Sequence, residues 1–505
     1  MGLFGGMQSA KVLTSSMRAP AIFRERLRCF AAVFAVALLV RLLYTFAVIP
    51  LFDLPVGPNH EDFHSSSDGY LDLARTLYDH HKLAFAPDQP PTTFRMPVFP
   101  FCVAVMRFFT GDFTLAVLLL NCIASAATVG LVSVLASRFF QRRSRIVSYS
   151  AAFFPLSIHY AATSFSDTMI GLTVVGYFAA LLCMLSRPGP RTAIVGGLTL
   201  AIAILTKPML TLFPPVLLMF VLFRRRITLR STLLSIVIAA VGVSAWSGRN
   251  YLVTRTFIPI STGGGFNLLA GNYMVEESHD CNVSFKHGTQ RALDQLSRET
   301  GRNWTPADLR PAGHFDFQPE LDRVFGDAAV SMILSDPALL FRKIGVNATR
   351  FWYFSSSPNR GLMCAAIHFP VLVAAAIALV RLHRGHPLAV ETIAVFITYY
   401  VLIYSVIIVH STRFALPILL LLTPFAAHTI VHACTARGKK ARKVSDEVLA
   451  LVSIETSQDS PDRAGVEPDQ GKRKGDQLVR PRRHVAQHKP LKNGHVVNKE
   501  TLVGR

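Results

Sequence analysis

Long apolar stretches separated by short polar segments cover most of the chain. Many of these stretches approach the roughly 20 residues that a helix needs to cross a bilayer, and they lack the alternation of a membrane β-strand. In hydrocarbon, only a helix or a closed barrel satisfies its own backbone hydrogen bonds. The pattern therefore predicts an all-α polytopic membrane protein with about ten transmembrane helices. We place them at residues 29–50, 113–136, 146–163, 167–185, 192–206, 209–223, 231–247, 362–381, 389–409 and 414–433.

The arginines of the chain predict its orientation. Four of the short segments between the predicted helices carry Arg: 137–145, 186–191, 224–230 and 381–387. Basic residues concentrate in cytoplasmic loops, so we expect these segments in the cytoplasm. Two long loops, 51–112 and 248–361, then fall on the outer side of the membrane.

The polar segments divide the chain into three regions. Residues 1–28 form a cytoplasmic N-terminal segment and residues 29–433 the transmembrane domain. Residues 434–505 are polar and poor in aromatics, which predicts a disordered basic cytoplasmic tail. In the first outer loop, an apolar run ending near Phe109 is too short to cross the membrane and predicts a helix along the interface. In the second, we expect a helix over residues 320–354.

Composition and cysteine usage exclude several other classes. The 505 residues are 51% hydrophobic and carry a net charge of +21. Such a charge can indicate nucleic-acid binding, but no basic patch carries the interleaved aromatics that stack on bases, and the arginines fit membrane topology instead. The seven cysteines form no CxxC pair, so neither a disulfide framework nor a zinc knuckle is indicated.

The first outer loop contains His60-Glu61-Asp62-Phe63-His64, a literal match to the HExxH motif. In zinc peptidases, this spacing places both His on one helix face with the Glu as general base. The flanking residues, with Pro55 and Pro58 before the motif and Ser65–Ser67 after it, are typical of a loop. A membrane metallopeptidase is therefore a distant alternative, and a looser divalent-metal contact stays open.

Two acids lie where predicted helices meet the outer face. Asp68 precedes an amphipathic helix in the first loop, and Asp167 begins the fourth apolar stretch. Either could cap a helix, because an acid in the first turn suits the helix dipole. An ionisable residue at a membrane interface is also a candidate functional residue.

Several cations share this outer side. Lys207 lies between two predicted helices, Arg249 ends another, and Arg413 opens the last, with His410 just before it. Each could extend along the membrane surface to reach lipid headgroups. Positive charge is depleted on the outer side, however, so Lys207, Arg249 and Arg413 together indicate an anion site facing the two acids. Acids opposite cations suit a reaction in which a carboxylate deprotonates a hydroxyl and cations neutralise a phosphate leaving group.

These residues lie in motifs that resemble those of the GT-C glycosyltransferases, over about residues 30–430. The resemblance is to bacterial dolichyl-phosphate-mannose–protein mannosyltransferase-like and aminoarabinose-transferase-like enzymes, including the Rgt type. The motifs are Asp68-Gly69-Tyr70, Arg95-Met96-Pro97-Val98-Phe99-Pro100, Leu205-Thr206-Lys207-Pro208, Trp246-Ser247-Gly248-Arg249-Asn250-Tyr251, Gly263-Gly264-Gly265-Phe266-Asn267 and Arg413-Phe414-Ala415-Leu416-Pro417-Ile418.

The resemblance implies an inverting glycosyltransferase that takes its sugar from a polyprenyl-phosphate-linked donor. It implies Asp68 as the catalytic base or acceptor-orienting group, and Asp167 as a second catalytic carboxylate that helps to orient the acceptor or a metal. It implies Lys207, Arg249 and Arg413 as donor-phosphate ligands. Further candidates are Tyr70, Arg95 and His410.

The acceptor would be a glycan, glycolipid or protein, and the metal requirement stays open. The expected location is a bacterial inner membrane, with the site facing outward. The main alternative is a transporter or flippase of lipid-linked substrates, although the polar residues gather at one face rather than at mid-bilayer.

Overall fold

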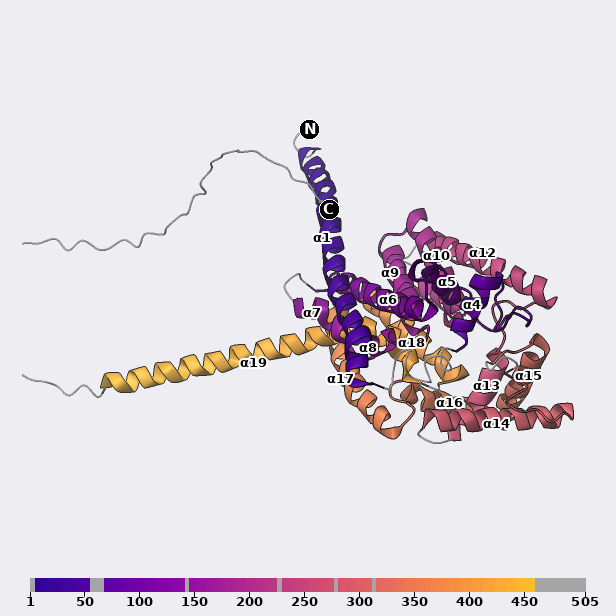
Figure 1. Cartoon of the computed structure of the whole chain (residues 1–505). Coiled ribbons are helices and arrows are strands. Elements are labelled where there is room, and N and C mark those ends of the chain that lie inside the picture. Colours follow the sequence, from indigo (N-terminus) through magenta and orange to yellow (C-terminus); the bar gives the residue numbers. More distant parts are fainter. Residues whose placement is uncertain are drawn as a thin grey trace, which may run out of the picture. The chain divides into compact units, whose positions relative to one another are not determined.

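The computed structural model of the chain describes residues 5–54, 68–140, 145–224, 229–276, 280–310, 315–409 and 411–458. Within these ranges every regular element is a helix (Figure 1), which confirms the predicted all-α class. The helices of the first half are α1 (Gly5–Leu43), α2 (Ile49–Phe52), α4 (Tyr70–His80), α5 (Val98–Thr110), α6 (Phe113–Ala136), α7 (Arg145–Tyr149), α8 (Pro155–Ala161), α9 (Asp167–Ser186), α10 (Pro190–Thr206), α11 (Phe213–Arg224) and α12 (Leu229–Thr254). Those of the second half are α13 (Gly264–Tyr273), α14 (Cys281–Thr300), α15 (Pro319–Ser335), α16 (Pro337–Arg350), α17 (Pro358–His383), α18 (Pro387–Ile407) and α19 (Leu416–Gln458).

In the described part of the chain, seven helices are long and apolar enough to cross a membrane. They are Arg24–Phe52, Phe113–Ala136, Asp167–Ser186, Leu229–Thr254, Pro358–His383, Pro387–Ile407 and Thr412–Arg437. Each matches a predicted helix, so the chain is an integral multi-pass membrane protein. The predicted helices at 192–206 and 209–223 correspond to α10 and α11, which are apolar but shorter.

The predicted single helix over 146–163 is wrong. The segment consists of α7, a 3-10 turn (Ser150–Phe153) and α8. Pro155 cannot donate a backbone hydrogen bond, and Phe154 before it is extended, with φ −70° and ψ 115°. The fully buried Arg41 of α1 donates hydrogen bonds to the Ala152 carbonyl at 3.1 Å and the Ser157 hydroxyl at 2.7 Å. A neighbouring helix therefore satisfies polar groups at this break.

Helices α13 to α15 of the second long loop share a hydrophobic core, which Phe354 and Ile408 join. Phe266, Phe317 and Phe325 pack together at its centre. A Cβ at Gly265 would overlap the carbonyl oxygen of Asp322, so a glycine allows α13 and α15 to meet this closely. The helix predicted over 320–354 is instead the pair α15 and α16, bent by 103°.

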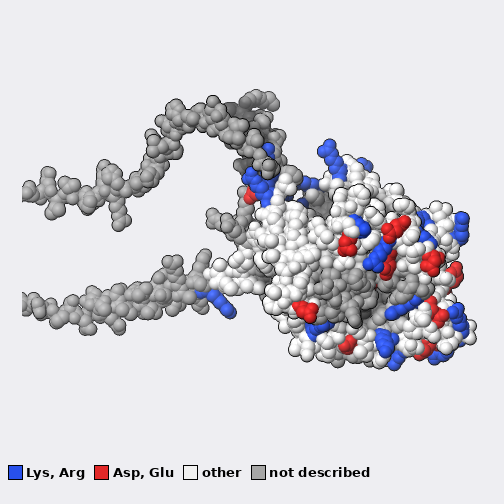
Figure 2. All heavy atoms as spheres, in the orientation of Figure 1, with Lys and Arg blue, Asp and Glu red and all other residues white. Residues whose placement is uncertain are grey.

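The first long loop packs on α6 through α4 and α5. Tyr70 of α4 meets Phe99 of α5 edge-on, with ring centres 5.2 Å apart, and both are buried. α5 is the helix expected at the interface, and it exposes Phe101, Phe108 and Phe109. Figure 2 shows charged side chains gathered on the side where α4, α14 and α15 lie, while the surface beside α1 and α17 is mostly uncharged.

The chain divides into two compact units, Met1–Lys439 and Lys440–Arg505. The tail predicted to be disordered from residue 434 begins inside α19, which ends at Gln458. Residues 459–505 lie outside the described residues.

Candidate functional site

Asp68 and Arg413 form an ion pair between distant parts of the chain. The Arg413 Nη2 donates a hydrogen bond to Asp68 Oδ2 at 3.1 Å. The residue that caps α4 is Gly69, which has no side chain, so Asp68 is not the N-cap that its position in the sequence suggested. Both Asp68 (φ +54°) and Gly69 (φ +78°) adopt the left-handed conformation, which Asp and Gly tolerate better than most residues.

Arg413 also meets the second acid. Its Nη1 lies 3.7 Å from Asp167 Oδ2 at the first residue of α9. Arg413 is 8% exposed and Asp167 is 4% exposed. The Arg413 guanidinium lies 4.4 Å from the centre of the Phe165 ring. Arg413 therefore bridges two carboxylates inside the protein and does not extend to lipid headgroups.

Lys207 lies beside this bridge at the end of α10. Its Nζ is 4.4 Å from the centre of the Phe414 ring. Burial lowers the pKa of Lys207 from 10.5 to about 8; the Asp167 carboxylate opposes this shift, and Arg413 adds to it. Lys207 is therefore mainly charged at pH 7 but loses its charge at a lower pH than an exposed lysine.

Arg95, in the first outer loop, is the fifth charged residue that lies at this site. Its Nε donates to the Asp68 carbonyl at 3.0 Å, and its Nη2 is 4.0 Å from the Asp68 carboxylate. The guanidinium also lies over Phe94 and Tyr70. We call Asp68, Arg95, Asp167, Lys207 and Arg413 the ion cluster. With three cations and two acids it is net positive, which suits an anionic ligand.

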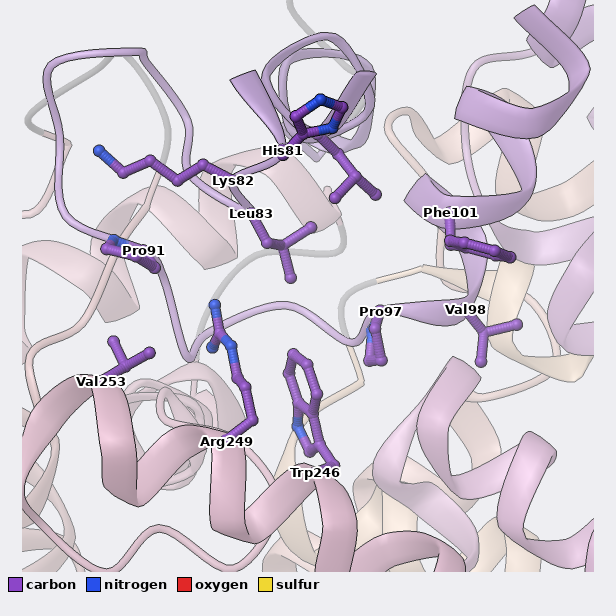
Figure 3. Close-up of a pocket in the computed structure, with 11 residues that line it drawn as sticks. His81, Lys82, Leu83, Pro91, Pro97, Val98, Phe101, Trp246, Arg249 and Val253 are labelled. Atoms are coloured by element: carbon purple, nitrogen blue, oxygen red, sulfur yellow. The ribbon is translucent and has the colours of Figure 1, made fainter. Parts of the chain in front are cut away.

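Arg249 lies in a different place. Its Nη1 donates to the Thr92 carbonyl at 2.7 Å, and its guanidinium is 4.7 Å from the Trp246 ring centre. Figure 3 shows both side chains projecting from one helix into a cavity of about 560 Å³, also lined by Lys82 and Phe101. Neither Lys207 nor Arg413 lines this cavity. The three predicted phosphate ligands are thus divided between the ion cluster and this cavity, which we call the Trp246 cavity.

Of the further candidates, Tyr70 is buried next to the ion cluster and hydrogen-bonds to Ser166; burial raises the pKa of its hydroxyl. His410 and the HExxH match at residues 60–64 lie outside the described residues. Among the described residues, no group of three or more His, Cys, Asp or Glu could hold a metal ion. The described residues of the ion cluster supply two carboxylates, and Arg413 pairs with both of them.

Sequence reasoning missed Asn121, which lies fully buried in α6. It hydrogen-bonds to residues on both sides of Asp167. The available signal was a carboxamide within an otherwise apolar stretch, since polar side chains in membrane helices commonly join one helix to another. The aromatic partners Phe165 and Phe414 were also missed, because nothing in an apolar stretch marks a ring that contacts a cation.

No family model matches the chain, and no curated protein matches its sequence. Among solved structures, the oligosaccharyltransferase of Archaeoglobus fulgidus in the apo form matches with 11% identity and a TM-score of 0.46. The match covers 86% of this chain and 53% of that chain, so this chain spans about half its length. ArnT from Cupriavidus metallidurans bound to undecaprenyl phosphate matches with 16% identity and a TM-score of 0.32, covering 77% of each chain. The apo state of the same protein matches with 15% identity and a TM-score of 0.33, covering 79% of this chain and 76% of that chain.

Proposed function

We propose that the chain is a GT-C-type glycosyltransferase that moves a sugar from a polyprenyl-phosphate-linked donor to an acceptor hydroxyl at the outer membrane face. The observation that carries this proposal is the bridge from Arg413 to Asp68 and Asp167, with Lys207 beside it. Carboxylates adjoining buried cations supply both a base for the acceptor and countercharge for a phosphate. The succession of motifs along residues 30–430 supports the same reaction.

In the proposed reaction, the acceptor hydroxyl gives its proton to Asp68, and its oxygen bonds to the anomeric carbon of the sugar. The bond from that carbon to the phosphate oxygen breaks, and the electron pair leaves with polyprenyl phosphate. Lys207 and Arg413 neutralise the charge that develops on this leaving group. A single displacement of this kind inverts the anomeric configuration. Asp167 orients Arg413 and the acceptor.

The ion pair of Asp68 and Arg413 gives this reaction a means of control. In the absence of donor, Arg413 Nη2 donates a hydrogen bond to Asp68 Oδ2 and so occupies an oxygen that would accept the proton. A donor phosphate would compete for the guanidinium, because charge-assisted bonds from Arg to phosphate are strong. Asp68 Oδ2 would then accept the proton of the acceptor hydroxyl once the donor is in place.

The Trp246 cavity is the proposed place for the lipid carrier next to its phosphate. Its apolar side chains, such as Leu83 and Phe101, suit an isoprenoid chain, and Arg249 and Lys82 offer positive charge. The acceptor is a glycan, a glycolipid or a protein. We place the enzyme in a bacterial inner membrane, with the ion cluster on the outer side.

The test uses purified full-length protein in nanodiscs and a panel of polyprenyl-phosphate hexoses and pentoses labelled in the sugar, with envelope extract as acceptor. We expect release of polyprenyl phosphate together with transfer of the label. Arg413→Gln should abolish both, whereas Arg360→Gln, which alters an exposed arginine at the start of α17, should change neither. Movement of an intact donor across a liposome membrane without cleavage would identify a flippase and contradict the proposal.

A further inference from the structure

Asn121 of α6 holds the chain on both sides of Asp167. Its amide nitrogen donates to the Thr163 carbonyl at 2.8 Å and to the Phe165 carbonyl at 3.0 Å. Its amide oxygen accepts a hydrogen bond from the Thr168 hydroxyl at 2.5 Å. One side chain therefore joins the turn before Asp167, and the first turn of α9, to a neighbouring membrane helix.

Thr128, another buried polar residue of α6, behaves differently: it donates to the Ala124 carbonyl at 2.8 Å, within its own helix. Ser125 does bond outside α6, to Ser157, but it does not contact the segment around Asp167. The bonds of Asn121 leave its helix. Burying a carboxamide is costly unless its donors and acceptor are paired, and here both N–H groups and the oxygen have partners. Such a fully bonded group fixes its neighbours in one geometry.

The segment that Asn121 holds contacts Arg413 at two points. The Phe165 ring centre lies 4.4 Å from the guanidinium, and Asp167 Oδ2 lies 3.7 Å from Nη1. We propose that Asn121 is a positioning residue that sets the Asp167 carboxylate and the Phe165 ring against Arg413. Its effect on rate rests on the proposed function; its effect on the position of the segment does not.

The test compares variants that remove the bonds of Asn121 with a matched control on the same helix. Asn121→Leu is similar in size and removes all three bonds, while Thr128→Val removes a bond within α6 only. Thr168→Val removes one bond of Asn121, and Thr168→Ser retains the hydroxyl. The last pair keeps the proposal testable if Asn121→Leu does not fold.

The first readout does not depend on catalysis. Ser166 is buried between Phe165 and Asp167, so Ser166→Cys reports the packing of this segment. A methanethiosulfonate reagent is added to the nanodisc protein, and labelling of the peptide that contains the introduced thiol is followed by mass spectrometry to separate it from the native cysteines. We expect labelling at least about tenfold faster with Asn121→Leu, through local opening, and unchanged with Thr128→Val.

The second readout is the rate of polyprenyl phosphate release. We expect Asn121→Leu to lower kcat on the order of 100-fold with little change in KM for the donor, because misplacement of a catalytic group mainly affects the chemical step. Thr168→Val should lower kcat about fivefold to tenfold, and Thr168→Ser should restore it.

The inference would be overturned if Asn121→Leu and Thr168→Val both left the labelling rate of Ser166→Cys equal to that of the parental protein. It would also be overturned if Thr128→Val raised this rate as much as Asn121→Leu does. If the parental protein releases no polyprenyl phosphate, the proposed function fails and the labelling rates alone decide the role of Asn121.

Discussion

At the scale of single residues, Asp68 offers the sharpest test. Asp68→Asn leaves an oxygen that can accept the hydrogen bond from Arg413 but removes the negative charge. Because the Asp68 side chain is 30% exposed, we expect unfolding stability to fall by only about 1 kcal/mol. Loss of the proton acceptor should lower transfer on the order of 100-fold. Initial rates of polyprenyl phosphate release and thermal unfolding in detergent measure the two effects.

Asp72→Asn is the matched control for this change. Asp72 lies in the first turn of α4, four residues after Asp68, and forms an ion pair with Arg75 at 3.3 Å, so both rate and stability should stay close to those of the parent. Near-normal transfer by Asp68→Asn would contradict its role as base, and Asp167 would become the first candidate.

Lys207 predicts a pH dependence. Its pKa of about 8 lies below the ordinary 10.5, so its positive charge is lost as pH rises through 8. If this charge binds the donor phosphate, kcat/KM should decline above about pH 8 in the free enzyme. Lys207→Arg should shift the decline to higher pH, because guanidinium stays protonated in this range. A profile that is identical in both proteins would exclude Lys207 as the titrating group.

At the scale of elements, a substitution of Arg249 tests whether the end of α12 binds the donor phosphate or positions the Thr92 segment. As a donor-phosphate ligand in the Trp246 cavity, Arg249→Gln should raise KM for the donor about tenfold with little change in kcat. It also loses a hydrogen bond to Thr92, at a cost of about 1 kcal/mol in stability. Steady-state kinetics over a range of donor concentrations measure the first effect, and thermal unfolding measures the second.

Arg255→Gln is the control, since Arg255 directly follows α12 and is exposed. A lower kcat at unchanged KM would instead mean that Arg249 acts through the Thr92 segment that leads to Arg95.

The helices show which parts of the fold a sequence pattern can predict. Continuous apolar stretches such as α6 and α9 were predictable, because length and hydropathy determine membrane crossing. The break at Phe154-Pro155 was not recognised, although a proline within a stretch is a standard signal for it. The broken helix is stabilised by hydrogen bonds from Arg41, which lies more than 100 positions away in the sequence. The hydropathy of residues 146–163 does not reveal that Arg41 packs there.

The candidate site was predictable in part for the same reason. Asp68, Asp167, Lys207 and Arg413 were expected on one side because alternation of the helices places them there. Arg249 was expected beside these residues. The alternating direction of the helices determines the side of the membrane on which a residue lies, but not its position in the membrane plane. Asn121 lies within a helix, and its role follows only from the packing of α6 against the turn before α9.

At the scale of the whole molecule, orientation in the membrane determines where the reaction takes place. We expect a reporter fused after Arg187 to be cytoplasmic and one fused after Asn303 to be external, because basic loops stay inside. Alkaline phosphatase activity, paired with fluorescence of a green fluorescent protein fusion at the same site, measures this. An external signal after Arg187 would place the ion cluster on the cytoplasmic side and contradict an outer-face reaction.

The bridge from Arg413 has a consequence for biosynthesis. Arg413 follows Asp68 by 345 positions, so at ordinary rates of translation about 20 to 70 s separate their emergence from the ribosome. Asp68 is already made throughout this time and Asp167 for most of it, while Arg413, which pairs with both, is still to be made. The ion cluster is thus completed only when the helix over Thr412–Arg437 is inserted, and the proposed reaction cannot begin before that step.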